Sequence, residues 1–189
     1  MILKFNLCNL LLILIPSLIL TVIIIRIAQS FRVNKILNPE DHDKRNIIEF
    51  LINLLLFIFI CAFTPIVIGV LFWTGIFLIV MAGVIYILSI IAFLKNKNGL
   101  ITNGIYSVTR NPMYIAMAMF LNGFLLMTLG SNLVLALLMG IIIIGFIRLI
   151  HVRVLNEERF LLNKYKGVFS KYCENTPRYI FNIKNMKSD

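Results

Sequence analysis

Polar side chains of several kinds gather in one short stretch between two apolar segments, residues 100–114, LITNGIYSVTRNPMY, called the hinge below. The side chains and turn residues with chemical or conformational potential in it are Gly104, Tyr106, Arg110, Asn111, Pro112 and Tyr114. A loop that only linked two membrane helices would need fewer and less varied groups, because irregular backbone at membrane depth survives only when it is buried in protein or lines a cavity. We therefore expect the hinge to form one wall of a small-molecule site.

A second charged group, Arg153, Glu157 and Glu158, lies in the C-terminal third of the chain. Arg153 and Glu157 are four residues apart, so on a helix they share a face and can line one wall together. The whole chain has only 8 acidic residues, and this scarcity favours a specific role for the glutamate pair over a plain solvated helix face. We expect this helix to supply the other wall, with an anion and a cation for a charged ligand.

Each of these residues also has a simpler interpretation. The arginines could be positively charged anchors on the cytoplasmic side, and the tyrosines could be interfacial anchors. The glutamate pair could be a solvated helix face, and Pro112 is sufficiently explained as the start of a helix. Only the ordered combination favours a functional site.

The composition places the chain among membrane proteins. Of its 189 residues, 60% are hydrophobic and 14% are charged, with a mean hydropathy of +0.97. We predict a single integral membrane domain over residues 1–189, with membrane lipids around it and no obligate protein partner. The net charge of +10 would favour nucleic-acid binding in a soluble protein, but here it indicates topology, and we predict no nucleic-acid partner.

The apolar runs predict an all-α fold with about five transmembrane helices, since about twenty residues cross the hydrocarbon core. The spans are 7–27, 47–69, 74–94, 112–129 and 133–150, followed by a basic, amphipathic cytoplasmic tail at 151–189 whose helical extension forms a cofactor pocket. The first run has no small-residue cleavage site after it and is predicted to remain as a helix. Pro65 and then Trp73-Thr74-Gly75 indicate the turn between the second and third spans.

Charge placement predicts the orientation. Apart from Lys4, all of the 18 basic residues lie in the first loop, the hinge, the C-terminal region or their flanks. Cytoplasmic loops carry the excess of Lys and Arg. Five spans then place the N-terminus outside and the C-terminus in the cytoplasm, with the hinge and the tail on the same side of a cell or inner membrane.

The hinge and the C-terminal region together resemble the superfamily of isoprenylcysteine carboxyl methyltransferases and phospholipid methyltransferases. The resemblance rests on the hinge motif, on the pair Glu157-Glu158, and on YKGVFSKY at 165–172 followed by Pro177-Arg178. Their order and spacing match over roughly the C-terminal half of the chain. Ile105 stands where the turn commonly has proline, Asn111 where the eukaryotic carboxyl methyltransferases have histidine, and Lys166 where glycine is usual.

The resemblance implies a methyltransferase that uses S-adenosyl-L-methionine and a lipophilic or membrane-associated acceptor. It assigns cofactor contact to the Arg-Asn-Pro-x-Tyr turn and the glutamate pair, and it indicates that Arg153 faces the acceptor. The predicted cofactor-binding residues are Gly104, Tyr106, Arg110, Asn111, Pro112, Tyr114, Glu157 and Glu158, and the predicted catalytic residues are Arg153 and Glu157. The acceptor atom, whether of a prenylcysteine carboxylate, a phospholipid amine or a thiol, stays open.

Two other functions are compatible with the sequence. Sterol reductases, which use a nicotinamide cofactor, resemble the same C-terminal architecture, although they are generally longer. A small structural membrane protein with a decayed site is the other alternative. The three cysteines, Cys8, Cys61 and Cys173, show no paired framework or metal-ligand spacing, so we predict no disulfide and no metal. We interpret His151 as an interfacial residue.

Overall fold

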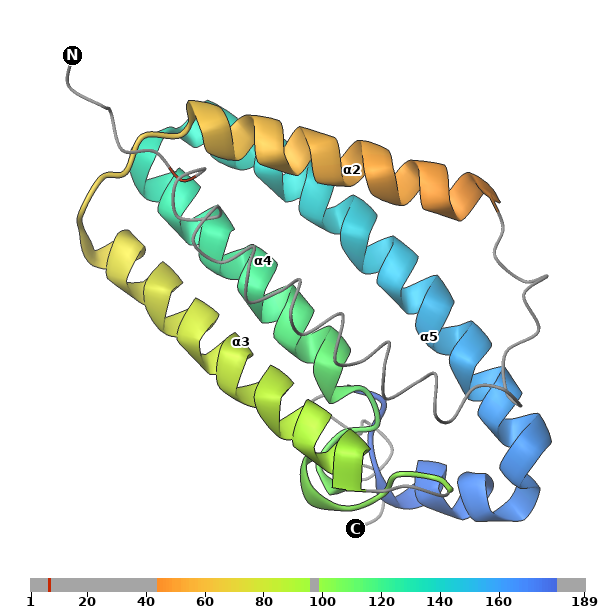
Figure 1. The fold of residues 1–189 in the computed structure, drawn as a ribbon. Coiled ribbons are helices and arrows are strands. Elements are labelled where there is room, and N and C mark those ends of the chain that lie inside the picture. The colour runs from red at the N-terminus through yellow and green to blue at the C-terminus, as the bar shows by residue number, and fades with distance from the viewer. Residues whose placement is uncertain (1–6, 8–43, 96–98, 180–189) are drawn as a thin grey trace, which may run out of the picture. The chain divides into compact units, whose positions relative to one another are not determined.

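The computed structural model describes Leu7, residues 44–95 and residues 99–179, and this part of the chain is helical without strands (Figure 1). The elements are α2 (Lys44–Phe63), α3 (Val70–Lys95), the short 3-10 helix η2 (Gly104–Ser107), α4 (Pro112–Ser131) and α5 (Leu133–Asn175). The all-α prediction is confirmed for these residues. The predicted first span, 7–27, lies outside them except for Leu7.

Three helices, α3, α4 and α5, are long and apolar enough to cross a membrane. Large apolar side chains are exposed along them, such as Phe77 on α3 and Ile144 on α5. Such side chains are suited to contact with lipid. The apolar part of α2, Ile48–Phe63, is shorter. The chain is therefore an integral membrane protein, while the count of five spans stays a prediction.

The turn between α2 and α3 lies earlier in the chain than expected. The predicted second span, 47–69, is too long, because α2 ends at Phe63 just before Pro65, which cannot continue a helix. The prediction of a turn at Trp73-Thr74-Gly75 was wrong, since these residues lie in the first turns of α3, which begins at Val70 rather than at residue 74. The predicted starts of α4 at Pro112 and α5 at Leu133 are confirmed.

The described residues form two compact units, of which the first contains α2, α3 up to Ile79, α4 from Phe120 and α5 up to Leu149. Within it, Figure 1 shows α2 running beside the first part of α5. Phe57 of α2 makes edge-on ring contacts with Phe124 of α4 at 5.6 Å and Phe146 of α5 at 6.4 Å. This buried aromatic cluster holds three helices together.

Glycines let α3 and α4 approach closely within the first unit. A Cβ built on Gly75 would lie 2.6 Å from the Gly123 carbonyl oxygen, and one on Gly123 would lie 2.8 Å from the Gly75 oxygen. Small residues at such crossings are typical of helix packing in membranes. Gly75 is therefore a packing residue, which explains why its interpretation as a turn residue failed.

The second unit contains the second half of α3, the hinge, α4 up to Met119 and the chain from Ile150 onward. Its α5 segment is interrupted at Lys166, which has φ +43° and ψ −121°. Figure 1 shows the chain changing direction there, so the last turns of α5 run at an angle to the part before the break. These last turns carry the side chains that meet the hinge.

We predict that Gly75→Ala destabilises the protein by about 1 to 3 kcal/mol, because the added methyl overpacks the crossing with α4. The measurement is the thermal unfolding midpoint in detergent. Gly83→Ala is the matched control on the same helix, since a Cβ there meets open space. Equal midpoints for the two variants would contradict the close-packing interpretation.

Candidate functional site

The hinge has a defined backbone that sets the direction of the side chains after it. Gly104 has φ +64°, a left-handed conformation that favours glycine, and it opens η2. The Ser107 hydroxyl donates to the Gly104 carbonyl at 2.7 Å. At the end of the hinge, the Asn111 carbonyl accepts bonds from the amides of Tyr114 and Ile115, both at 3.2 Å, so α4 starts at a fixed place.

The first side-chain cluster joins the hinge to α5. The Tyr114 hydroxyl donates to Glu157 Oε1 at 2.7 Å, and Arg153 Nε donates to the same oxygen at 3.2 Å. Glu157 Oε2 accepts no hydrogen bond from the described residues. The side chains of Arg153 and Glu157 are 64% and 47% exposed, so both retain access to a ligand. The prediction that they share a helix face is confirmed.

The second cluster is more buried and is centred on Glu158. Arg178 binds its carboxylate through two nitrogens, with Nε 3.1 Å from Oε1 and Nη2 2.7 Å from Oε2. Arg110 Nη2 lies 3.5 Å from Oε1, and the side chains of Arg110 and Glu158 are only 12% and 13% exposed. A bidentate arginine fork is among the strongest protein hydrogen-bond arrangements. Glu158 thus neutralises part of the charge of two arginines.

Backbone carbonyls of the C-terminal segment tie it to the hinge. The Arg110 amide donates to the Pro177 carbonyl at 2.9 Å. The Arg178 carbonyl accepts from the Thr109 hydroxyl at 3.2 Å and from Asn111 Nδ2 at 3.1 Å. Asn111, which stands where histidine is usual in the resemblance, thus uses its amide to hold the tail.

One tyrosine hydroxyl and one cysteine thiol on the last turns of α5 also contact the hinge. The Tyr172 hydroxyl donates to the Tyr106 carbonyl at 2.6 Å, and Arg110 Nη1 donates to the Cys173 sulfur. These residues lie beyond the predicted fifth span. Burial raises the pKa of the Tyr172 hydroxyl, and it raises the pKa of the Cys173 thiol although Arg110 acts in the opposite direction. Both groups therefore stay protonated near neutral pH.

Hydrogen bonding to Glu158 raises the pKa of the Arg178 guanidinium, so Arg178 keeps its charge at any ordinary pH.

Arg110 Nε is buried and has no hydrogen-bond partner among the described residues. A buried donor without a partner costs free energy. It is therefore a place where a ligand oxygen or a water would be stabilising.

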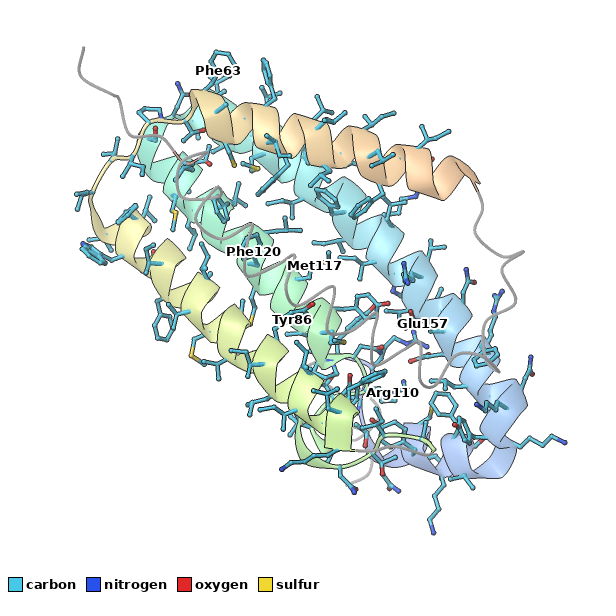
Figure 2. The ribbon with its side chains drawn as sticks, viewed as in Figure 1. Phe63, Tyr86, Arg110, Met117, Phe120 and Glu157 are labelled. Atoms are coloured by element: carbon cyan, nitrogen blue, oxygen red, sulfur yellow. The ribbon has the colours of Figure 1, made fainter. Side chains whose placement is uncertain are left out.

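The structure brings the predicted site residues together in the second unit. Arg110 and Glu157 lie at the end where α4 begins (Figure 2). Tyr114 meets Glu157, and Arg110 meets Glu158, while Gly104 and Pro112 contribute through backbone conformation and helix start. The sequence interpretation gave no role to Thr109, Cys173 or Arg178. The Pro177-Arg178 dipeptide was part of the resemblance, and the scarcity of acidic residues was the signal that could have paired Arg178 with Glu158.

The remaining predictions concern His151, metal binding and the cysteines. His151 Nδ1 lies 3.0 Å from the Tyr179 hydroxyl, so the ring has a polar partner at the surface. No cluster of metal-binding side chains occurs among the described residues. Cys61 and Cys173 are not disulfide-bonded, and Cys8 lies outside the described part.

Comparison with known protein families identifies the family to which this chain belongs. The sequence model of the phospholipid methyltransferase family matches residues 66–167, more than half of the chain. The chain belongs to the phospholipid methyltransferase family. This family is part of the isoprenylcysteine carboxyl methyltransferase superfamily, so the predicted relationship is confirmed. The comparisons with curated proteins and with solved structures found no match.

The range matched by the phospholipid methyltransferase family covers only part of the candidate site. The hinge and the segment with Arg153, Glu157 and Glu158 lie inside the match, which ends at Gly167. The residues that reach back from the tail, Tyr172, Cys173 and Arg178, lie beyond it.

We predict that Lys166→Gly stabilises the protein by about 0.5 to 1 kcal/mol, because a strained non-glycine conformation costs about 1 to 3 kcal/mol and glycine's flexibility when unfolded offsets part of the gain. Thermal unfolding in detergent measures it. Lys171→Gly is the matched control at an exposed helical position, where glycine should destabilise by about 1 kcal/mol. A Lys166→Gly protein that loses as much stability as the control would show that the φ angle is not strained.

Proposed function

We propose that this protein is an S-adenosylmethionine-dependent membrane methyltransferase that acts on a lipophilic acceptor, with its cofactor side formed by the hinge and the glutamate pair. The observation that carries the proposal is the contact of Tyr114 and Arg153 with Glu157, which lies within the range matched by the family. The family match favours methyl transfer over the reductase alternative.

The residues present have the chemistry that the cofactor needs. S-adenosylmethionine has an ammonium group, a carboxylate and a sulfonium, so its site requires an anion and a cation close together. Glu157 offers an oxygen that no described residue uses, and Arg110 on the hinge has the unpaired Nε. These groups therefore fit the cofactor.

Each residue has a proposed role. Glu157 binds the positive or hydroxyl groups of the cofactor, and Tyr114 orients the Glu157 carboxylate. Arg110 and Glu158 lie on the cofactor side, with Asn111 and Pro112 fixing the end of the hinge and Gly104 and Tyr106 its turn. When bound, the cofactor supplies a methyl group on a sulfonium, and the methyl moves to the acceptor while the sulfur keeps the electron pair.

Arg153 is proposed to face the acceptor, and its charge favours an acceptor carboxylate. Its Nε is turned to Glu157, and its exposed guanidinium can hold an anion by a charge-assisted bond. An acceptor carboxylate is already a nucleophile, so holding its oxygen in line with the methyl group, at about 3 to 3.5 Å, would be the main catalytic requirement. This proposes an isoprenylcysteine carboxyl O-methyltransferase-like reaction, with the tail and hinge on the cytoplasmic side and the N-terminus outside.

We expect the purified protein in detergent to bind S-adenosylmethionine in calorimetry. Glu157→Gln should weaken binding about tenfold or more, because glutamine keeps an acceptor oxygen but loses the negative charge that strengthens the hydrogen bond. Glu174→Gln, which removes an exposed carboxylate further along α5, is the control and should bind like the wild type. No heat from folded wild-type protein at millimolar cofactor would refute the proposal.

The acceptor is tested by the chemistry of the product. With cofactor labelled in the methyl group and a prenylcysteine analogue in detergent, we expect label that alkali releases as methanol, since a methyl ester hydrolyses and an N-methyl or S-methyl group does not. Arg153→Gln should lower the rate and leave cofactor affinity close to that of the wild type. Alkali-stable label on a phospholipid amine would contradict a carboxylate acceptor.

A further inference from the structure

The two adjacent glutamates have opposite surroundings. Both oxygens of Glu158 are bound by Arg178, and Arg110 approaches one of them. Glu157 is 47% exposed against 13% for Glu158, and among the described residues only its Oε1 accepts hydrogen bonds. A carboxylate has about four lone-pair positions, so Glu158 has little capacity left for a ligand and Glu157 has much.

Glu158 also could not turn toward a ligand without a large loss. Arg110 is nearly buried, and removing its counter-ion would leave a charge without compensation in a region of low dielectric. Arg178 would lose its fork at the same time. The pairing therefore holds Glu158 in its present orientation.

The same pairing fixes the C-terminal segment against the hinge. Arg178 carries both the side chain that binds Glu158 and the carbonyl that accepts from Thr109 and Asn111. The neighbouring Pro177 carbonyl accepts from the Arg110 amide. One residue thus connects three places: the glutamate pair, the end of the hinge and the tail.

We propose that Arg178 and Glu158 are positioning residues that clamp the tail onto the hinge, and that Glu157 alone of the pair binds the cofactor. The assignment of Glu157 rests on the proposed function, and it refines the role of Glu158 from direct contact to support. The clamp itself rests on contacts of the described residues. Because Arg178 lies beyond the family match, the site depends on a segment that the match does not cover.

The test combines cofactor calorimetry with hydrogen exchange of the peptide that contains the Arg110 amide. Arg178→Ala and Glu158→Gln should each speed exchange of this peptide about tenfold or more and raise the cofactor Kd about tenfold at unchanged stoichiometry. Glu157→Gln should raise the Kd with exchange unchanged. Arg178→Lys, which keeps the charge without the fork, should fall between wild type and Arg178→Ala.

Arg159→Ala is the matched control, because it removes an exposed arginine next to Glu158. It should alter neither measurement. A lower stoichiometry at unchanged Kd in the clamp variants would mean that they merely unfold part of the protein, and this would overturn the positioning role.

Other outcomes are equally decisive. Glu158→Gln that abolishes binding with exchange still slow would make Glu158 a direct ligand and overturn the division of roles. Arg178→Ala that changes neither measurement would refute the clamp. A wild type that binds no cofactor would refute the proposed function and the role of Glu157, whereas the exchange data would still decide the clamp.

Discussion

A nearly buried carboxylate between two arginines is the interaction on which the site depends. Glu158 compensates Arg110 from the hinge and Arg178 from the tail, in a chain with 18 basic and only 8 acidic residues. Charges so placed are costly unless they are paired and hydrogen-bonded. The hinge and the C-terminal part of the chain, about fifty residues or more apart in the sequence, must therefore meet at one place. Glu157, the adjacent residue, holds the more exposed cluster with Tyr114 and Arg153.

The helices could be predicted from the apolar runs because hydrophobic length is the dominant signal in a membrane chain. Pro112 gave the start of α4 correctly, since proline suits a first helical turn. Gly75 misled, because a glycine that permits close helix packing looks the same in a sequence as one that permits a turn. Which role it has depends on Gly123, nearly fifty residues away, and no local pattern contains that information.

Within the candidate site, the side chains that meet could be predicted from the sequence, whereas the contacts made by backbone groups could not. Arg110, Tyr114 and the glutamate pair could be found from their types and order. The attachment of the tail could not, because the acceptors are carbonyl groups of Pro177 and Arg178, which any residue would offer. Asn111 shows the same limit: its amide could be recognised as a hydrogen-bonding group, but its partner is a backbone oxygen. Lys166 was noted as an unusual residue at a glycine position, and its positive φ gives the physical reason why glycine would be preferred there.

The short apolar part of α2 bears on the lipid around the protein. Ile48–Phe63 would extend about 24 Å at 1.5 Å per residue, against about 30 Å for a typical hydrocarbon core. As a crossing helix, α2 would pull the lipid headgroups inward beside it. Local thinning of this kind would shorten the distance that an amphiphile travels from the leaflet into the protein. The rate of the reaction would then depend on the thickness of the bilayer.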